Sequence, residues 1–191
     1  ERALAASPAI EFVAGSEFDF TIQEIAQGWP LPKVAGLSYR TNGHFERSPE
    51  RPRLQNMDAL PFVVDVYHRD LVIEQYFIGY LLHPYVSLYT GRACRSRCTF
   101  CLWPQTVGGH RYRTRSVEHV VAEIARARGH FPKVKEYFFD DDTFTDDLPR
   151  AEAIARRLGD LGVTWSCNAK ANVPEATLKV LRDNGLRLLL V

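Results

Sequence analysis

Three cysteines lie on one short stretch of the chain, at Cys94, Cys98 and Cys101. Iron–sulfur clusters are held by closely spaced cysteine thiolates, whereas a structural zinc ion usually takes four protein ligands, often in two separated pairs. Three thiolates on a four-iron cluster leave one iron without a protein ligand, and that iron can bind a small molecule. The spacing therefore favours a cluster that takes part in a reaction. A zinc site completed by Cys167 or His110 is the alternative.

The fourth cysteine, Cys167, lies in an apolar, strand-like stretch. Free cysteine is among the most frequently buried residue types, so we interpret Cys167 as a packed core residue and not as a ligand. Because three of the four cysteines belong to one motif, the sequence does not indicate a disulfide framework. A reducing compartment is expected for such a chain.

A run of three carboxylates, Asp140, Asp141 and Asp142, directly follows an apolar segment. Adjacent carboxylates repel one another, so they need a cation or hydrogen-bond donors close by. One alternative is a solvated acidic turn that caps the next helix through Asp146 or Asp147. A magnesium site is a further option.

The segment after the cysteines is basic. In an extended segment, Arg111, Arg113 and Arg115 would share one side of the chain. Such a row could hold a phosphate, a carboxylate or a sugar, and His110 lies next to it, so His110, Arg111 and Arg113 are candidate substrate contacts. A solvated loop is the alternative, because charge runs are usually exposed.

The composition is that of an ordinary globular protein, with 46% hydrophobic and 25% charged residues among 191. The net charge of +1 provides no electrostatic reason to expect a nucleic-acid partner or an anionic membrane surface. The sequence contains no apolar run near the roughly 20 residues that span a bilayer. We therefore expect no transmembrane segment and a cytoplasmic location, with peripheral attachment to a membrane left open. The first residue is not methionine and the last stretch is apolar, so we interpret the chain as an excerpt.

Strands and helices alternate in the second half of the sequence. Apolar stretches predict strands at 85–90, 136–139, 163–168 and 186–191, and amphipathic periodicity predicts helices between them. Ser116 is the expected N-cap of the first helix, and Gly129 its expected end. Such alternation predicts an α/β fold with a parallel sheet wound by right-handed crossovers. Because the cysteines follow the first strand, where barrel enzymes assemble their active sites, a (β/α) barrel is favoured over an open sheet.

The first 84 residues have a different character. We predict a strand at 9–14, a helix starting near Asp19, and a hairpin at the Asn42-Gly43 pair. Residues 47–61 are rich in proline and charge, which predicts an irregular linker.

The spacing C-x-x-x-C-x-x-C, with Phe100 just before the third cysteine, resembles the signature of the radical S-adenosylmethionine (radical SAM) superfamily. The resemblance implies that Cys94, Cys98 and Cys101 ligate a 4Fe-4S cluster. The open iron would then chelate S-adenosylmethionine (SAM), and one electron would cleave its sulfonium to give a 5′-deoxyadenosyl radical. Reduced flavodoxin or ferredoxin is the implied electron donor, and Phe100 would lie beside the adenine.

The acidic run matches the F-x-D-D-x-F pattern of cobalamin-type radical SAM proteins, through Phe139, Asp141, Asp142 and Phe144. The resemblance implies that the carboxylates of Asp140, Asp141 and Asp142 hold the amine of SAM. It also makes Lys170 a candidate for the SAM carboxylate or the substrate, although related sequences often carry arginine here. An ammonium cannot make the two-pronged contact of a guanidinium, and a surface lysine is the alternative.

A closer resemblance is to the hopanoid-biosynthesis-associated cobalamin-type radical SAM proteins. It rests on residues 94–116, 138–147 and 166–172. Residues 1–30 look like the tail of a cobalamin-binding domain, whose D-x-H-x-x-G loop is not in this sequence. The implied organisation is that tail, a connector with a β-hairpin at 31–84, and part of a radical SAM barrel at 85–191. The implied substrate is a hopanoid lipid, with cyclitol ether formation as the reaction.

Other functions remain open. A radical SAM RNA-modifying enzyme would share the cysteine loop but should carry a basic RNA-binding surface. A cobalamin-dependent C-methyltransferase would share the loop and the implied cofactors. A zinc or electron-transfer module would keep the metal without turning over SAM. We nominate no side-chain acid or base as a catalytic residue.

Overall fold

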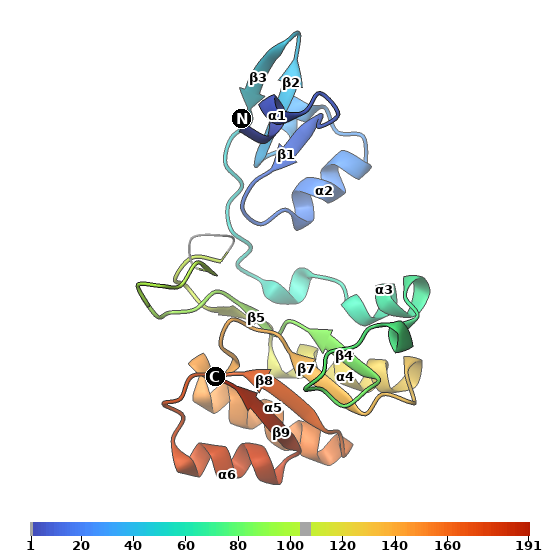
Figure 1. Cartoon of the computed structure of the whole chain (residues 1–191), viewed down its shortest axis with the longest axis vertical. Helices are drawn as coiled ribbons and strands as arrows, with labels where there is room; N and C mark the ends of the chain where they lie inside the picture. Colours follow the sequence, from blue (N-terminus) through green and yellow to red (C-terminus); the bar gives the residue numbers. More distant parts are fainter. Residues whose placement is uncertain (1, 104–107) are drawn as a thin grey trace. The chain divides into compact units, whose positions relative to one another are not determined.

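The computed structural model describes residues 2–103 and 108–191 (Figure 1). They form two compact units, one of residues 2–55 with Gly108 and one of residues 56–103 with 109–191. The segments 1–30, 31–84 and 85–191 remain a prediction about family origin, and their boundaries do not coincide with this division. Among the described residues, no helix is both long and apolar enough to cross a membrane.

The first unit is a small antiparallel sheet with helices. Its strands β1 (Phe12–Ala14), β2 (Leu37–Thr41) and β3 (His44–Arg47) pair in the order β1-β2-β3. Asn42 and Gly43 take φ values of 48° and 80°, as the tight turn of the predicted hairpin requires. The helices of this unit are α1 (Arg2–Ala6) and α2 (Asp19–Ala26).

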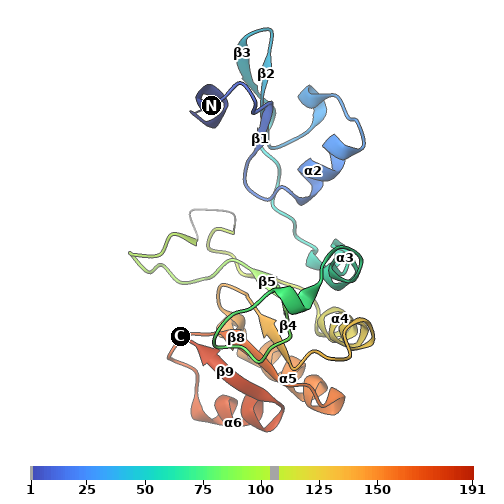
Figure 2. The ribbon, with the colours of Figure 1, turned by 45° about the vertical axis from the view of Figure 1, so that its right-hand side comes forward.

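The second unit is built on a parallel sheet. The strands β4 (Tyr85–Leu88), β7 (Glu136–Phe139), β8 (Trp165–Asn168) and β9 (Leu186–Leu190) lie side by side in that order. The helices α4 (Val117–His130), α5 (Leu148–Leu161) and α6 (Glu175–Asp183) connect them in turn (Figure 2). Strands paired in chain order with right-handed crossovers place these helices on one face of the sheet. The predicted α/β architecture is confirmed.

Three aromatic side chains fill the core where β7 and β8 meet. Phe139 and Phe144 stack with ring centroids 5.1 Å apart, and Trp165 lies within 5.6 Å of both. All three are fully buried. Since Phe139 ends β7 and Phe144 begins the short helix η5 (Phe144–Asp146), the acidic run between them is anchored at both ends. The two phenylalanines of the F-x-D-D-x-F pattern are therefore core residues.

Two features differ from the sequence predictions. Residues 63–70 form a helix, α3 (Val63–Asp70), in a region for which we had predicted no element. Its Val64 N–H donates to the buried carboxylate of Glu123 in α4, 3.2 Å away. The helix α4 does not end at Gly129, as predicted, but continues to His130. Its C-cap is the buried Phe131, whose N–H donates to Ala127 O.

The N-cap of α4 offers a test of local stability. The Ser116 hydroxyl accepts the His119 N–H at 3.1 Å, as predicted for a cap. We expect Ser116→Ala to lower the free energy of unfolding by about 1 kcal/mol because a helical N–H loses its partner. Ser116→Thr keeps the hydroxyl acceptor and should lose much less. Urea unfolding measures both, and equal losses would contradict a capping role.

Candidate functional site

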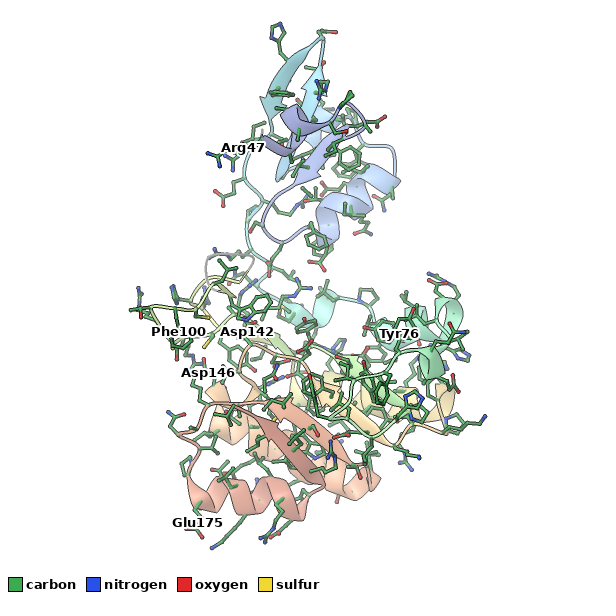
Figure 3. All side chains as sticks on the ribbon, viewed as in Figure 1. Arg47, Tyr76, Phe100, Asp142, Asp146 and Glu175 are labelled. Atoms are coloured by element: carbon green, nitrogen blue, oxygen red, sulfur yellow. The ribbon has the colours of Figure 1, made fainter. Side chains whose placement is uncertain are left out.

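The candidate residues gather at the carboxyl ends of the parallel strands. The cysteine loop follows β4, the acidic run follows β7, and Lys170 follows β8. In Figure 3, Asp142 and Asp146 lie beside the loop that carries Phe100. The carboxyl edge of a parallel sheet is where α/β proteins bind ligands.

All four cysteines are free thiols. Cys94 is 9% exposed, Cys98 is exposed and Cys101 is intermediate. The Cys101 N–H donates to Cys98 O at 3.1 Å, which makes the tight turn between these two residues. Three free thiols on one loop form a sulfur-only donor set, which suits an iron–sulfur cluster. Cys167 is fully buried in the core, and burial raises the pKa of its thiol.

The three thiols of the loop do not form a group that could hold a metal ion in this structure. Within residues 2–103 and 108–191, no three His, Cys, Asp or Glu side chains are close enough together to hold a metal ion. The Cys94 sulfur instead lies 3.5 Å from Thr143 Oγ1 and accepts the Ser96 N–H at 3.4 Å. The ligand role of the three cysteines therefore stays a prediction.

Asp141 is a buried hub beneath the cysteine loop. Its two oxygens accept the Thr90 N–H at 2.5 Å, the Thr90 hydroxyl at 2.6 Å and the Tyr112 hydroxyl at 2.9 Å. The carboxyl group is fully buried, and this burial raises its pKa. Asp141 is thus supplied with donors from inside the protein.

This hub joins the two ends of the cysteine loop. Thr90 precedes the cysteines and Tyr112 follows them, so one carboxyl group binds both ends. Directly after Thr90 the chain forms β5 (Gly91–Arg92), and directly after Tyr112 it forms β6 (Arg113–Thr114); these two strands pair with each other. A side chain at Gly91 would lie 2.6 Å from the Tyr112 ring, so glycine is needed at this close approach. Arg150 reinforces the closure by donating to Thr90 O at 2.9 Å.

Asp140 and Asp142 differ from Asp141. Asp140 accepts from Asn168 Nδ2 at 3.1 Å and lies 3.4 Å from the Tyr89 hydroxyl. Burial raises the pKa of the Asp142 carboxyl group. The hydrogen bond that Asp142 accepts from the Ala93 N–H acts in the opposite direction but is outweighed. The three carboxylates therefore have separate sets of partners, and these two lie nearer the surface than Asp141.

Asp146 and Asp147 divide the roles that the sequence left open. Asp147 caps α5, since its carboxylate accepts the Arg150 N–H at 3.1 Å. Asp146 does not cap a helix but lies 2.5 Å from Lys170 Nζ. Lys170 is thus an ion-paired residue and not a free surface lysine. Phe100 is 90% exposed, so its ring is open to solvent.

The basic segment does not form an exposed row. Arg113 and Arg115 are buried, whereas Arg111 is exposed. Arg115 Nη1 lies 2.5 Å from the buried Glu123 carboxylate, and its guanidinium also donates to Tyr89 O. Arg115 therefore links the segment that follows the cysteine loop to α4. His110 Nδ1 lies 2.9 Å from Ser96 O. Substrate roles for His110, Arg111 and Arg113 stay predictions.

Several site residues were not found from the sequence. Thr90, Tyr112, Arg150 and Thr143 were not among the predicted site residues, although Tyr112 and Thr143 lie within the stretches 94–116 and 138–147. Thr90, Tyr112 and Thr143 lie after β4, before β6 and after β7, and Arg150 lies in the first turn of α5. For Thr90, the available signal was a polar residue at the carboxyl end of a predicted strand.

Comparison with known proteins adds family information. A family model described as the radical SAM superfamily matches residues 88–191. An uncharacterised methyltransferase from Pyrococcus horikoshii is 30% identical over 198 residues, which cover 97% of this chain and 40% of that protein. Cytidylyl-2-hydroxyethylphosphonate methyltransferase from Streptomyces wedmorensis is 29% identical over 165 residues, 81% of this chain and 30% of that protein. The chain thus spans less than half the length of these relatives.

Two solved structures share the fold. Both are of the radical SAM methyltransferase TsrM from Kitasatospora setae. One contains tryptophan and a SAM analogue, with a TM-score of 0.66 and 16% identity. The other contains cobalamin and a [4Fe-4S] cluster, with a TM-score of 0.67 and 17% identity. Each match covers 95% of this chain and 37% of that one.

Proposed function

The chain belongs to the radical SAM superfamily, and from this premise we propose that it is part of a cobalamin-dependent radical SAM methyltransferase. Two observations support methyl transfer in particular. Both curated relatives are named methyltransferases. The solved TsrM structures have this fold over both units of the chain, and one of them contains cobalamin and a cluster.

The observation that carries the proposal is the loop of three free thiols at the carboxyl edge of the sheet. We assign Cys94, Cys98 and Cys101 as the ligands of a 4Fe-4S cluster. When bound, the cluster supplies one-electron reduction and an iron that can bind the amino and carboxylate groups of SAM. Reduced flavodoxin or ferredoxin is the proposed donor of that electron.

The acidic run would bind the SAM ammonium group through two of its three members. We assign this role to Asp140 and Asp142, because the oxygens of Asp141 are already occupied by Thr90 and Tyr112. A carboxylate beside an ammonium group stabilises the charged form of both. The exposed ring of Phe100 is available to lie against the adenine.

The hopanoid substrate implied by the sequence resemblance is more specific than membership of the radical SAM superfamily. Neither curated relative is named for hopanoid chemistry. We therefore place methyl transfer ahead of hopanoid side-chain rearrangement, which remains a candidate because of the motifs at 94–116 and 138–147. The cobalamin-binding assignment of residues 1–30 likewise remains part of the proposal.

A labelling experiment tests the proposal. The intact protein would be reconstituted anaerobically with iron, sulfide and cobalamin, and then supplied with reductant, methyl-labelled SAM and a panel of acceptors that includes a hopanoid. We expect four irons and four sulfides per chain, with label transferred to an acceptor and S-adenosylhomocysteine released.

Two other outcomes would count against methyl transfer. Release of 5′-deoxyadenosine with an altered hopanoid and no transferred label would favour radical rearrangement. A single zinc ion without sulfide would overturn the family chemistry itself.

A further inference from the structure

Asp146 joins two loops of the candidate site. One of its oxygens accepts the Arg95 N–H at 2.9 Å, and the other lies 2.5 Å from Lys170 Nζ. Its side chain is only 7% exposed. Because Arg95 directly follows Cys94, the contact fixes the backbone next to the first cysteine. Asp146 thereby holds the cysteine loop and the loop after β8 together.

The Cys94 sulfur has an unusually polar surrounding for a buried thiol. Thr143 Oγ1 and the Ser96 N–H contact it at 3.5 Å and 3.4 Å. Asp146 binds both the Lys170 ammonium group and the backbone N–H of Arg95, the residue that directly follows Cys94. The lysine therefore places a positive charge near Cys94.

We propose that Lys170, held in place by Asp146, is a positioning residue that sets the reduction potential of the cluster through the Cys94 sulfur. Reduction adds a negative charge to a cluster, and a nearby fixed cation stabilises the reduced state. Hydrogen bonds to ligand sulfurs and net local charge are among the main determinants of such potentials. A partly buried site strengthens the effect, because water screens the charge less.

The inference rests on the proposed cluster but not on methyl transfer. It also differs from the role that the family resemblance implies for Lys170, a contact with the SAM carboxylate. A residue that only binds SAM changes SAM affinity and leaves the potential of the SAM-free cluster unchanged. The two roles are therefore separated by a measurement made without SAM.

The test is an anaerobic redox titration of the reconstituted intact protein without SAM, followed by electron paramagnetic resonance of the reduced cluster. We expect Lys170→Met to disfavour reduction about tenfold, which is about 59 mV more negative for a one-electron couple. Lys170→Arg should restore most of the shift.

Lys179→Met is the matched control. Lys179 forms an exposed ion pair with Glu175 on α6, far along the chain from the cysteines, so its loss should leave the potential unchanged. An unchanged potential in Lys170→Met with full cluster content would overturn the inference. So would loss of iron from a folded Lys170→Met protein, because the lysine would then hold the cluster in place. Absence of a cluster from the wild-type protein would instead refute the proposed function.

Discussion

Replacing Cys98 by serine should remove the cluster and lower SAM-dependent turnover by about 10³-fold or more, a loss of at least about 4 kcal/mol of transition-state stabilisation. The reason is that a cluster with three protein ligands cannot lose one and keep its geometry. Cys98 is exposed, so the substitution places no polar group in the core. The fold should therefore survive, and iron and sulfide analysis with an activity assay measures the effect.

Cys167→Ala is the control for this prediction. Cys167 is also a cysteine, but it is buried between β7 and β9 in the core. Its loss should cost about 1 kcal/mol of stability through a small cavity and leave the iron content unchanged. Full iron and activity in Cys98→Ser, or loss of iron in Cys167→Ala, would show that the ligands are wrongly assigned.

Asp141→Ala should destabilise the protein by about 3 to 5 kcal/mol, the largest effect on stability that we expect from a site residue. The substitution leaves three buried donors without an acceptor: the Thr90 N–H, the Thr90 hydroxyl and the Tyr112 hydroxyl. Asp141→Asn keeps one acceptor oxygen and the shape of the side chain, so it should cost less than half as much. Urea unfolding of both variants measures the difference.

The pH dependence of the free energy of unfolding, compared between the wild type and Asp141→Asn, tests the charge state of Asp141. Burial raises the pKa of this carboxyl group above its ordinary value of 3.8. Between 3.8 and the raised value, the folded state therefore binds a proton that the unfolded state has released. Stability from this group falls as pH rises through that window. The difference in free energy of unfolding between the wild type and Asp141→Asn should therefore become smaller as pH rises. A difference that grows with pH would mean that the carboxylate is charged and stabilised in the folded protein.

The βα repeats were predictable because their signals are local. Amphipathic periodicity identified α4, α5 and α6, and the Ser116 cap was evident from residue type. The helix α3 was missed because it directly follows the proline-rich segment 47–61, and the buried carboxylate that receives its Val64 N–H lies 59 residues away in sequence. Tertiary partners of this kind cannot be recognised from local pattern.

The same limit applies to the carboxylates of the site. Their residue type and position after a strand were evident, but their different roles were not. Asp141 is distinguished by Thr90, which lies 51 residues earlier in the chain, and by Tyr112. Asp146 is distinguished from Asp147 by a backbone N–H 51 residues away. Residue type thus predicts which groups gather at this edge, and packing decides what each one does.

The stacked pair of Phe139 and Phe144 has a consequence for how this segment can vary. Both rings are fixed in the interior, so the four residues between them form a bridge of set length. One inserted or deleted residue would move each carboxylate into its neighbour's place and turn the wrong one inward. A substitution in this segment leaves its length unchanged, whereas an insertion or deletion would require the packing of Phe139 and Phe144 to be rebuilt.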